Sequence, residues 1–273
     1  MNLNRRLFLK RASGLFVAAA PALIFPKGLV HAQGGMGPGP GMVHSTGGGA
    51  LGLQTSLGSF FSLDNTLNDA TGAVTALTNN NTVTFVTPPG GGLAAVTNCA
   101  NFVVASSQYL SHADATGINV AGIDFSLQVW FYSTGNTAYL ASKSSGGFGS
   151  REYNWDYTFG TGASNPVRVD LNNSGAITTG NVTNTAWHHA VITYNATSKA
   201  TIVYIDGASA ATGNSNTVPA GTSQLNIGAS PLPNIYWGGN LCLFGTWRNR
   251  ILSAGDVTLL YNSGAGLSYA AMA

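Results

Sequence analysis

Charged residues are scarce in this sequence of 273 residues, where Asp, Glu, Lys and Arg make up 7%, against about 25% in an average globular domain. Glu152 is the only glutamate, so one of the strong helix formers is nearly missing. The surface must therefore be solvated mainly by neutral polar side chains. Val, Thr, Tyr, Gly and Asn are abundant, which favours short strands joined by turns, because β-branched and aromatic side chains fit a pleated sheet and Gly and Asn tolerate positive φ.

Paired carboxylates, which glycoside hydrolysis requires on either side of the scissile bond, are also lacking. A single glutamate excludes a pair of glutamates. No two aspartates stand two positions apart, the spacing that brings both to one face of a strand. The eight aspartates are Asp64, Asp69, Asp114, Asp124, Asp156, Asp170, Asp206 and Asp256. The sequence therefore predicts a protein that is not an enzyme, and a glycan-active enzyme is the least favoured class.

Only two cysteines occur, Cys99 and Cys242. In an oxidising compartment they could pair as a disulfide, and otherwise they would be two small apolar side chains of the core. A disulfide requires Cα atoms about 4.4–6.8 Å apart. The sequence does not give that separation, so both alternatives stay open.

The N-terminus carries an export pattern. Arg5 and Arg6 precede Phe-Leu-Lys, an apolar stretch covers 15–25, and small residues follow near Ala32. This pattern resembles a bacterial twin-arginine signal peptide over residues 1–32, which implies the twin-arginine translocase as a partner during export and a secreted or periplasmic destination. The apolar stretch is shorter than the roughly 20 residues that span a bilayer and contains a proline, so no membrane span is expected in the mature chain.

Cleavage after Ala32 would remove five of the eleven basic residues and leave six against nine acidic ones, which changes the formal charge from +2 to −3. Binding to nucleic acid needs a cluster of Lys and Arg that faces the phosphates. No such cluster remains, so a nucleic-acid partner is not expected.

Residues 33–56 are rich in Gly and Pro and predict a flexible linker, and residues 57–273 are expected to form one domain. Within the domain, short alternating runs recur between turn signals and predict about ten strands. The runs are 82–86, 100–104, 125–132, 138–142, 153–159, 167–171, 187–194, 201–205, 223–227 and 240–247. This number suits an all-β fold, a two-sheet antiparallel β-sandwich. Residues 252–261, with Ser253 as N-cap, predict a short helix.

Two adjacent histidines, His188 and His189, lie in one of the predicted strands. Successive side chains on a strand point to opposite faces of the sheet, so the two imidazoles cannot bind one metal ion. No nearby Cys, Glu or third His completes a zinc-like set. Structural histidines are therefore predicted, with His189 on the face of Trp187 and His188 on the face of Tyr194.

Several segments resemble, in the same order, those of laminin G-like and concanavalin A-like jelly-roll domains. They are LDNTLNDATG (63–72), ANFVVASSQYLS (100–111), FSLQVWFY (125–132), AWHHAVITYNATSKATIVYIDGASAATG (186–213) and WGGNLCLFGTWRNRILSAGDVTLLYN (237–262). The fourth segment carries a Trp, a following His and a Tyr-x-Asp-Gly turn. The resemblance implies a concanavalin A-like jelly roll over roughly residues 57–265. Where many relatives have acidic residues in the closing strand, this chain has Cys242 and Leu243.

Aromatic residues in polar segments indicate where such a domain would bind a ligand. In SREYNWDYTFG (150–160), alternation places Tyr153, Trp155 and Tyr157 on one face, with Arg151 nearby. Rings with polar neighbours can hold a sugar face, and the alternative is that this face belongs to the core.

A second group of candidates lies in or near loops. Tyr236 and Trp237 end the segment PLPNIYW (231–237), and aromatic residues on loops often contact ligands. Asp156 and Asp170 are candidates for a calcium site, or for ordinary turn and hydrogen-bonding groups.

The fold implied by the resemblance does not name a function. We expect a secreted, non-catalytic module that binds a glycan or another component of the extracellular or envelope surface. The alternative is a structural jelly roll, displayed on a phage particle or envelope with the Gly/Pro-rich arm as a tether.

Overall fold

The computed structural model describes residues 51–135, 138–144, 151–157 and 164–273, and for 151–157 and 164 it describes the backbone alone. The predicted leader, residues 1–32, and most of the predicted linker lie outside the described residues. No helix in the described part of the chain is long and apolar enough to cross a membrane.

Eight strands form the first sheet, in the order β13-β12-β11-β6-β15-β4-β3, with β1 also paired to β15. All of these pairings are antiparallel. The strands are β1 (Leu57–Phe61), β3 (Thr84–Val86), β4 (Cys99–Phe102), β6 (Phe125–Ser133), β11 (Trp187–Tyr194), β12 (Ala200–Ile205), β13 (Ala208–Asn214) and β15 (Gly239–Arg248).

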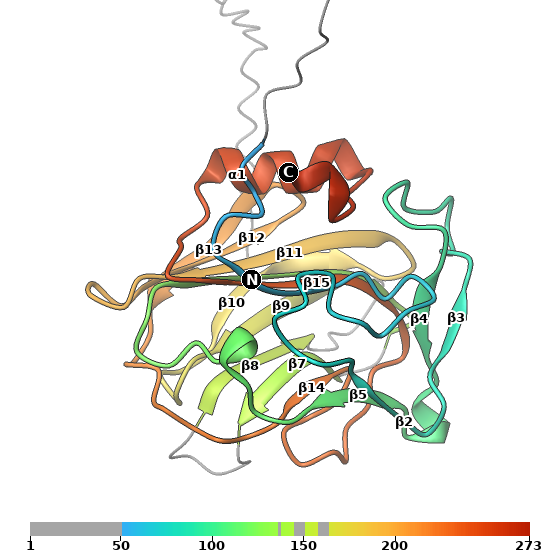
Figure 1. Cartoon of the computed structure of the whole chain (residues 1–273), viewed down its shortest axis with the longest axis horizontal. Coiled ribbons are helices and arrows are strands. Elements are labelled where there is room, and N and C mark those ends of the chain that lie inside the picture. The colour runs from blue at the N-terminus through green and yellow to red at the C-terminus, as the bar shows by residue number, and fades with distance from the viewer. Residues whose placement is uncertain (1–50, 136–137, 145–150, 158–163) are drawn as a thin grey trace, which may run out of the picture. The chain divides into compact units, whose positions relative to one another are not determined.

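Seven strands form the second sheet, in the order β10-β9-β8-β7-β14-β5-β2, again antiparallel throughout. They are β2 (Thr78–Asn80), β5 (Tyr109–His112), β7 (Ala138–Ser144), β8 (Arg151–Tyr157), β9 (Ser164–Asp170), β10 (Ile177–Thr183) and β14 (Leu225–Ile227). Figure 1 shows the two sheets stacked as layers, with helix α1 (Ala254–Tyr261) on the side of the first sheet that faces away from the second. The predicted two-sheet antiparallel β-sandwich is confirmed.

Short 3₁₀ turns complete the described elements. They are η1 (Val104–Ser106), η2 (Thr116–Ile118), η3 (Asn262–Gly264) and η4 (Ala270–Met272). The last two follow α1 and end the chain.

The core of the domain lies between the sheets, and a second buried layer lies between the first sheet and α1. Strand β6 contributes to both, because its residues are buried on both faces apart from Tyr132. Phe131 packs edge-on against Trp237 on the core side, with ring centroids 6.0 Å apart. Trp130, on the other face, stacks on Tyr261 of α1 at 5.7 Å. Because both faces of β6 are covered, even its polar residues Ser126 and Gln128 are buried.

The folded domain begins before residue 57, the start that the sequence predicts. Leu53 is fully buried, and its N–H donates to the carbonyl of Met272 at 3.1 Å. Trp247 Nε1 donates to the carbonyl of Leu53 at 2.6 Å. Residues 51–56, predicted as linker, are therefore held in place by the C-terminal segment and by β15, which corrects the boundary.

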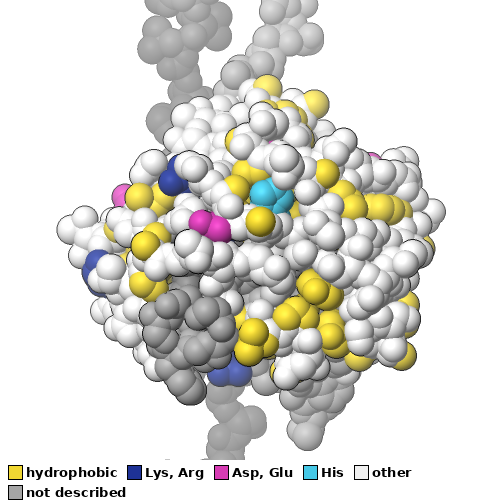
Figure 2. Space-filling view, turned by 60° about the horizontal axis from the view of Figure 1, so that its bottom comes forward, with side chains coloured by type: hydrophobic (Ala, Val, Ile, Leu, Met, Phe, Trp, Pro, Cys, Tyr) yellow, Lys and Arg dark blue, Asp and Glu magenta, His cyan; other side chains and the backbone are white. Residues whose placement is uncertain are grey.

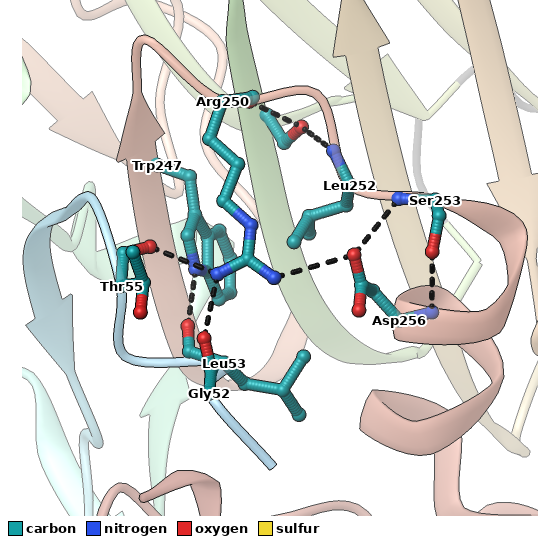
Figure 3. Close-up of polar contacts among 9 residues, drawn as sticks. Gly52, Leu53, Thr55, Trp247, Arg250, Leu252, Ser253 and Asp256 are labelled. Atoms are coloured by element: carbon teal, nitrogen blue, oxygen red, sulfur yellow. Dashed lines mark hydrogen bonds and ion pairs between the residues drawn. The ribbon is translucent and has the colours of Figure 1, made fainter.

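Arg250 also holds residues 51–56, which we call the entry segment (Figure 3). One guanidinium nitrogen donates to the carbonyls of Gly52, at 2.7 Å, and Thr55, at 3.0 Å. A second nitrogen lies 3.3 Å from Oδ2 of Asp256. Asp256 also accepts from the backbone N–H of Ser253 while the Ser253 hydroxyl accepts from the N–H of Asp256, a capping box that starts α1. The predicted N-cap is thus confirmed.

Candidate functional site

The adjacent histidines point to opposite faces of β11, as predicted. His188 lies beside Phe131, and its Nδ1 is 2.8 Å from Oδ2 of Asp206. His189 stacks on Trp130, with ring centroids 4.9 Å apart, and its Nε2 is 3.1 Å from the side-chain oxygen of Gln128. Both imidazoles thus have structural partners, and no cluster of three potential metal ligands occurs among the residues that the structure describes.

Burial keeps the ring of His189 neutral. The loss of solvation lowers its pKa to about 3, while the negative charge of Asp206 acts weakly in the opposite direction. A neutral, fully buried histidine between Trp130 and the helix is a packing residue.

The outer face of the second sheet has a different character, since the strand register brings polar residues together there. A row of residues in register crosses six strands from β2 to β9. We call it the polar row, and its members are Thr78, Ser111, Asn226, Ser142, Asn154 and Asp170. The neighbouring row includes Leu110, Ile227 and Val169, which face the core and are almost fully buried. Hydroxyl and amide groups therefore mark the outer face of this sheet.

A loop, residues 228–238, joins β14 to β15 and lies over the centre of the polar row. Ser142 Oγ donates to the carbonyl of Ala229 at 2.9 Å. The Asn226 side-chain amide donates to the carbonyls of Ser230 and Pro231 at 3.1 and 3.2 Å. The loop therefore covers the middle of the polar row, where Asn226 and Ser142 are buried. The two ends of the row lie on either side of the loop.

Two tyrosines lie where this loop meets β5. The rings of Tyr236 and Tyr109 have centroids 6.2 Å apart and are tilted by 37°, and both side chains are partly exposed. The hydroxyl of Tyr236 donates to the carbonyl of Pro233 at 2.7 Å, which holds its ring in place. Next to Tyr109 in register is Asn80, whose amide donates to Ser111 Oγ at 2.9 Å. We call Asn80, Tyr109 and Tyr236 the tyrosine corner site.

The predicted binding residues do not form a single group. Tyr236 belongs to the tyrosine corner site, but Trp237 is fully buried against Phe131. The prediction that Trp237 contacts a ligand is therefore wrong, because the residue next to the loop already belongs to the core.

The other predicted residues lie in β8. The side chains of Arg151, Tyr153, Trp155, Asp156 and Tyr157 are outside the described part of the structure. In the backbone register, Trp155 pairs with Val169 and with Ala141. Strand β8 is separated from β5 by β7 and β14, three steps or about 14 Å, so the β8 residues and Tyr236 belong to different parts of the sheet.

The predicted calcium ligands lie on the neighbouring strands β8 and β9. Asp156 is in register with Arg168, and Asp170 is in register with Asn154. Because these two pairs are two positions apart, both aspartates belong to the same face of the sheet. Calcium takes six to eight oxygen ligands, and a calcium site at this pair stays a prediction.

The surface near the second sheet carries little charge. Figure 2 brings forward the side on which this sheet lies in Figure 1, and neutral polar groups prevail there, with scattered hydrophobic side chains and few charged ones. At the loop tip, Leu232 is 64% and Ile235 is 40% exposed. A neutral polar surface edged by aromatic and aliphatic groups suits an uncharged, amphipathic ligand.

One family model matches more than half of the chain. Residues 104–258 match the model described as the concanavalin A-like lectin/glucanases superfamily. The matched stretch begins in η1 and ends within α1, so it includes the strands that carry most of both sheets. No curated protein matches the chain.

Similar solved structures include several binding domains. Domain 4 of AbnA, an extracellular arabinanase from Geobacillus stearothermophilus, solved with arabinotriose, has a TM-score of 0.56 and 14% identity over 74% of this chain and 97% of that one. The binding domain of Paraclostridial Mosquitocidal Protein 1 has a TM-score of 0.57 and 16% identity, over 78% and 53%. The receptor-binding domain of botulinum neurotoxin C/D mosaic serotype has 0.56 and 13%, over 76% and 51%. This chain spans about half of the last two, and at these identities the likeness concerns the fold alone.

Proposed function

The chain belongs to the concanavalin A-like lectin/glucanases superfamily, and from this membership we propose that it is an exported, non-catalytic module that binds neutral carbohydrate. The binding surface in this proposal is the tyrosine corner site on the outer face of the second sheet.

The observation that carries the proposal is the pair of partly exposed tyrosines beside a row of hydroxyl and amide groups. A sugar presents an apolar C–H face and a rim of hydroxyls. Aromatic rings pack against the first, while Asn, Ser and Thr side chains both donate and accept hydrogen bonds with the second. Both kinds of group meet at Tyr109 and Asn80.

Charge favours a neutral glycan over a sulfated or uronic one. Among the described strands, Arg168 on the outer face is in register with an aspartate, Asp156. Recognition of sulfate or carboxylate commonly uses several Arg or Lys side chains. The residues from 33 onward carry six basic groups against nine acidic ones, so the net charge would repel an anionic polymer.

The aspartates support a non-catalytic role, because most of those described are engaged in holding loops and strand ends. The Asp69 carboxylate, for example, accepts from the backbone N–H groups of Phe60, Thr71, Ala73 and Val74. Others accept from Thr97, Lys143, Ala196, His189 and Ser253. These carboxylate oxygens are occupied by donors of the protein itself, which fits a structural role for them.

The similar structures add support of the same kind. One is a domain of an extracellular arabinanase solved with arabinotriose, and others are binding domains of toxins. By analogy we propose short neutral oligosaccharides as the ligand class, and export by the N-terminal leader as the route to them.

A glycan array probed with the labelled full chain tests the proposal. We expect binding to neutral glycans that persists in a calcium chelator, and no cleavage of the bound glycans on prolonged incubation. Absence of binding to any glycan by a chain shown to be folded would support the structural role instead. Cleavage of a bound glycan would refute the non-catalytic role.

A further inference from the structure

The two cysteines, far apart in the sequence, face each other across neighbouring strands. Strands β4 and β15 pair with Phe102 opposite Gly239, Asn101 opposite Asn240 and Ala100 opposite Leu241. Extending this register by one residue places Cys99, the first residue of β4, opposite Cys242. Both are fully buried, and both are free thiols in this structure.

Directly opposed residues of an antiparallel pair have Cα atoms about 4.5 or 5.5 Å apart, depending on the hydrogen-bonding pattern. Both values fall within the range of about 4.4–6.8 Å that a disulfide spans. The register thus supplies the separation that the sequence left open.

The surroundings of the thiols agree with this placement. Cys99 interacts with the side chain of Asn240, which lies on the same face of β15 as Cys242. Burial raises the pKa of Cys99 to about 12, and this interaction opposes the rise. The pKa of Cys242 is also raised, mainly by burial and further by the nearby Cys99. The two thiols therefore belong to facing positions of neighbouring strands, protonated and shielded from solvent.

We propose that Cys99 and Cys242 are a cross-linking site that forms an intramolecular disulfide when the chain folds in a medium containing a disulfide oxidant. Two S–H bonds break and one S–S bond forms. The two hydrogen atoms pass to the oxidant, so that one oxidised glutathione yields two reduced glutathiones. The proposal does not depend on what the domain binds.

The cross-link would join segments separated by residues 100–241, almost the whole of the sandwich. It would fix β4, and with it the edge strand β3, to the central strand β15. Burial of both thiols means that the bond must form during folding, because a buried, protonated thiol reacts slowly with an external disulfide.

The test is a thiol count on the full chain. The reduced chain is unfolded in denaturant and refolded in buffer with oxidised and reduced glutathione, then denatured near neutral pH in the presence of excess maleimide and weighed. We expect a monomer that takes no label, is lighter than the reduced chain by two hydrogen atoms, and takes two labels after reduction. Peptide mapping should find Cys99 linked to Cys242.

Two labels on the refolded monomer would overturn the proposal, and so would glutathione adducts or linked dimers as the main product. As a second measurement, the oxidised monomer should melt about 5–10 °C above the reduced one. This difference should vanish in the C99A/C242A variant, and an equal difference in that variant would also contradict the proposal.

Discussion

His188 of β11 contacts Asp206, which directly follows the neighbouring strand β12, with Nδ1 of the imidazole 2.8 Å from Oδ2 of the carboxylate. The other carboxylate oxygen accepts from the backbone N–H of His189 at 2.9 Å. Asp206 and Gly207 form the two-residue turn between β12 and β13, and both have positive φ, 51° and 82°. This is the geometry of a type I′ hairpin turn. One aspartate therefore shapes the turn and ties it back to β11.

Replacing Asp206 should destabilise the domain by an amount that depends on the new side chain. Asp206→Ala removes both acceptors and places a residue that disfavours positive φ, so we expect a loss of about 1–3 kcal/mol. Asp206→Asn tolerates the backbone conformation and retains one acceptor, so it should lose less. Urea denaturation of both variants measures the free energies of unfolding, and equal losses would contradict a role for the positive-φ conformation and for the retained acceptor.

Acid should weaken the fold through His189. Its pKa is about 3 in the folded protein and 6.5 in a model compound, so between these values the unfolded chain binds a proton that the folded chain does not. Stability is therefore fully present above about pH 6.5 and falls as the pH decreases toward 3, by up to about 1.4 kcal/mol per pH unit from this residue. Urea denaturation at several pH values measures the slope.

The His189→Gln variant is the matched control for this slope, because glutamine is polar, neutral and of similar length. The stability of the variant should depend less steeply on pH between 3 and 6.5 than that of the wild type. Parallel curves for the two proteins would show that other groups cause the acid sensitivity.

Arg250 should control how firmly the entry segment is held. Arg250→Lys keeps the charge but cannot donate to Gly52, Thr55 and Asp256 together. We expect faster hydrogen exchange of the backbone amides of residues 51–56 and a loss of stability of about 1 kcal/mol. Exchange in β11 should be affected much less, and uniform acceleration over the whole domain would contradict a local role.

Local patterns predicted the elements whose sequences carry strong signals. Strand β11 has the predicted bounds, because its apolar and aromatic residues are buried on both faces. Helix α1 starts after Ser253 as predicted, because the capping box needs only residues close in sequence. Strands β10 and β13, ITTGNVT and ASAATGN, were not predicted. They are edge strands of small, polar and glycine residues, which are held by pairing with a neighbour rather than by their own pattern.

The candidate site was harder to predict, since it depends on register rather than on a motif. The polar row takes one residue from each of six strands, and no local stretch of sequence shows their alignment. Tyr109 was missed because a single tyrosine before Leu110 gives no sign that it will face Tyr236. The same limitation applies to the cysteines, whose facing positions follow from the pairing of β4 with β15.

The measurement that most directly tests the tyrosine corner site is a calorimetric titration of the full chain and two variants with the neutral oligosaccharide that binds most strongly on the array. Tyr109→Ala removes a partly exposed ring from the site, and its dissociation constant should rise about tenfold or more. Leu259→Ala is the matched control, because Leu259 is exposed on α1, on the opposite side of the sandwich. This variant should bind the oligosaccharide with the affinity of the wild type. Unchanged affinity in a folded Tyr109→Ala variant would contradict the proposed site.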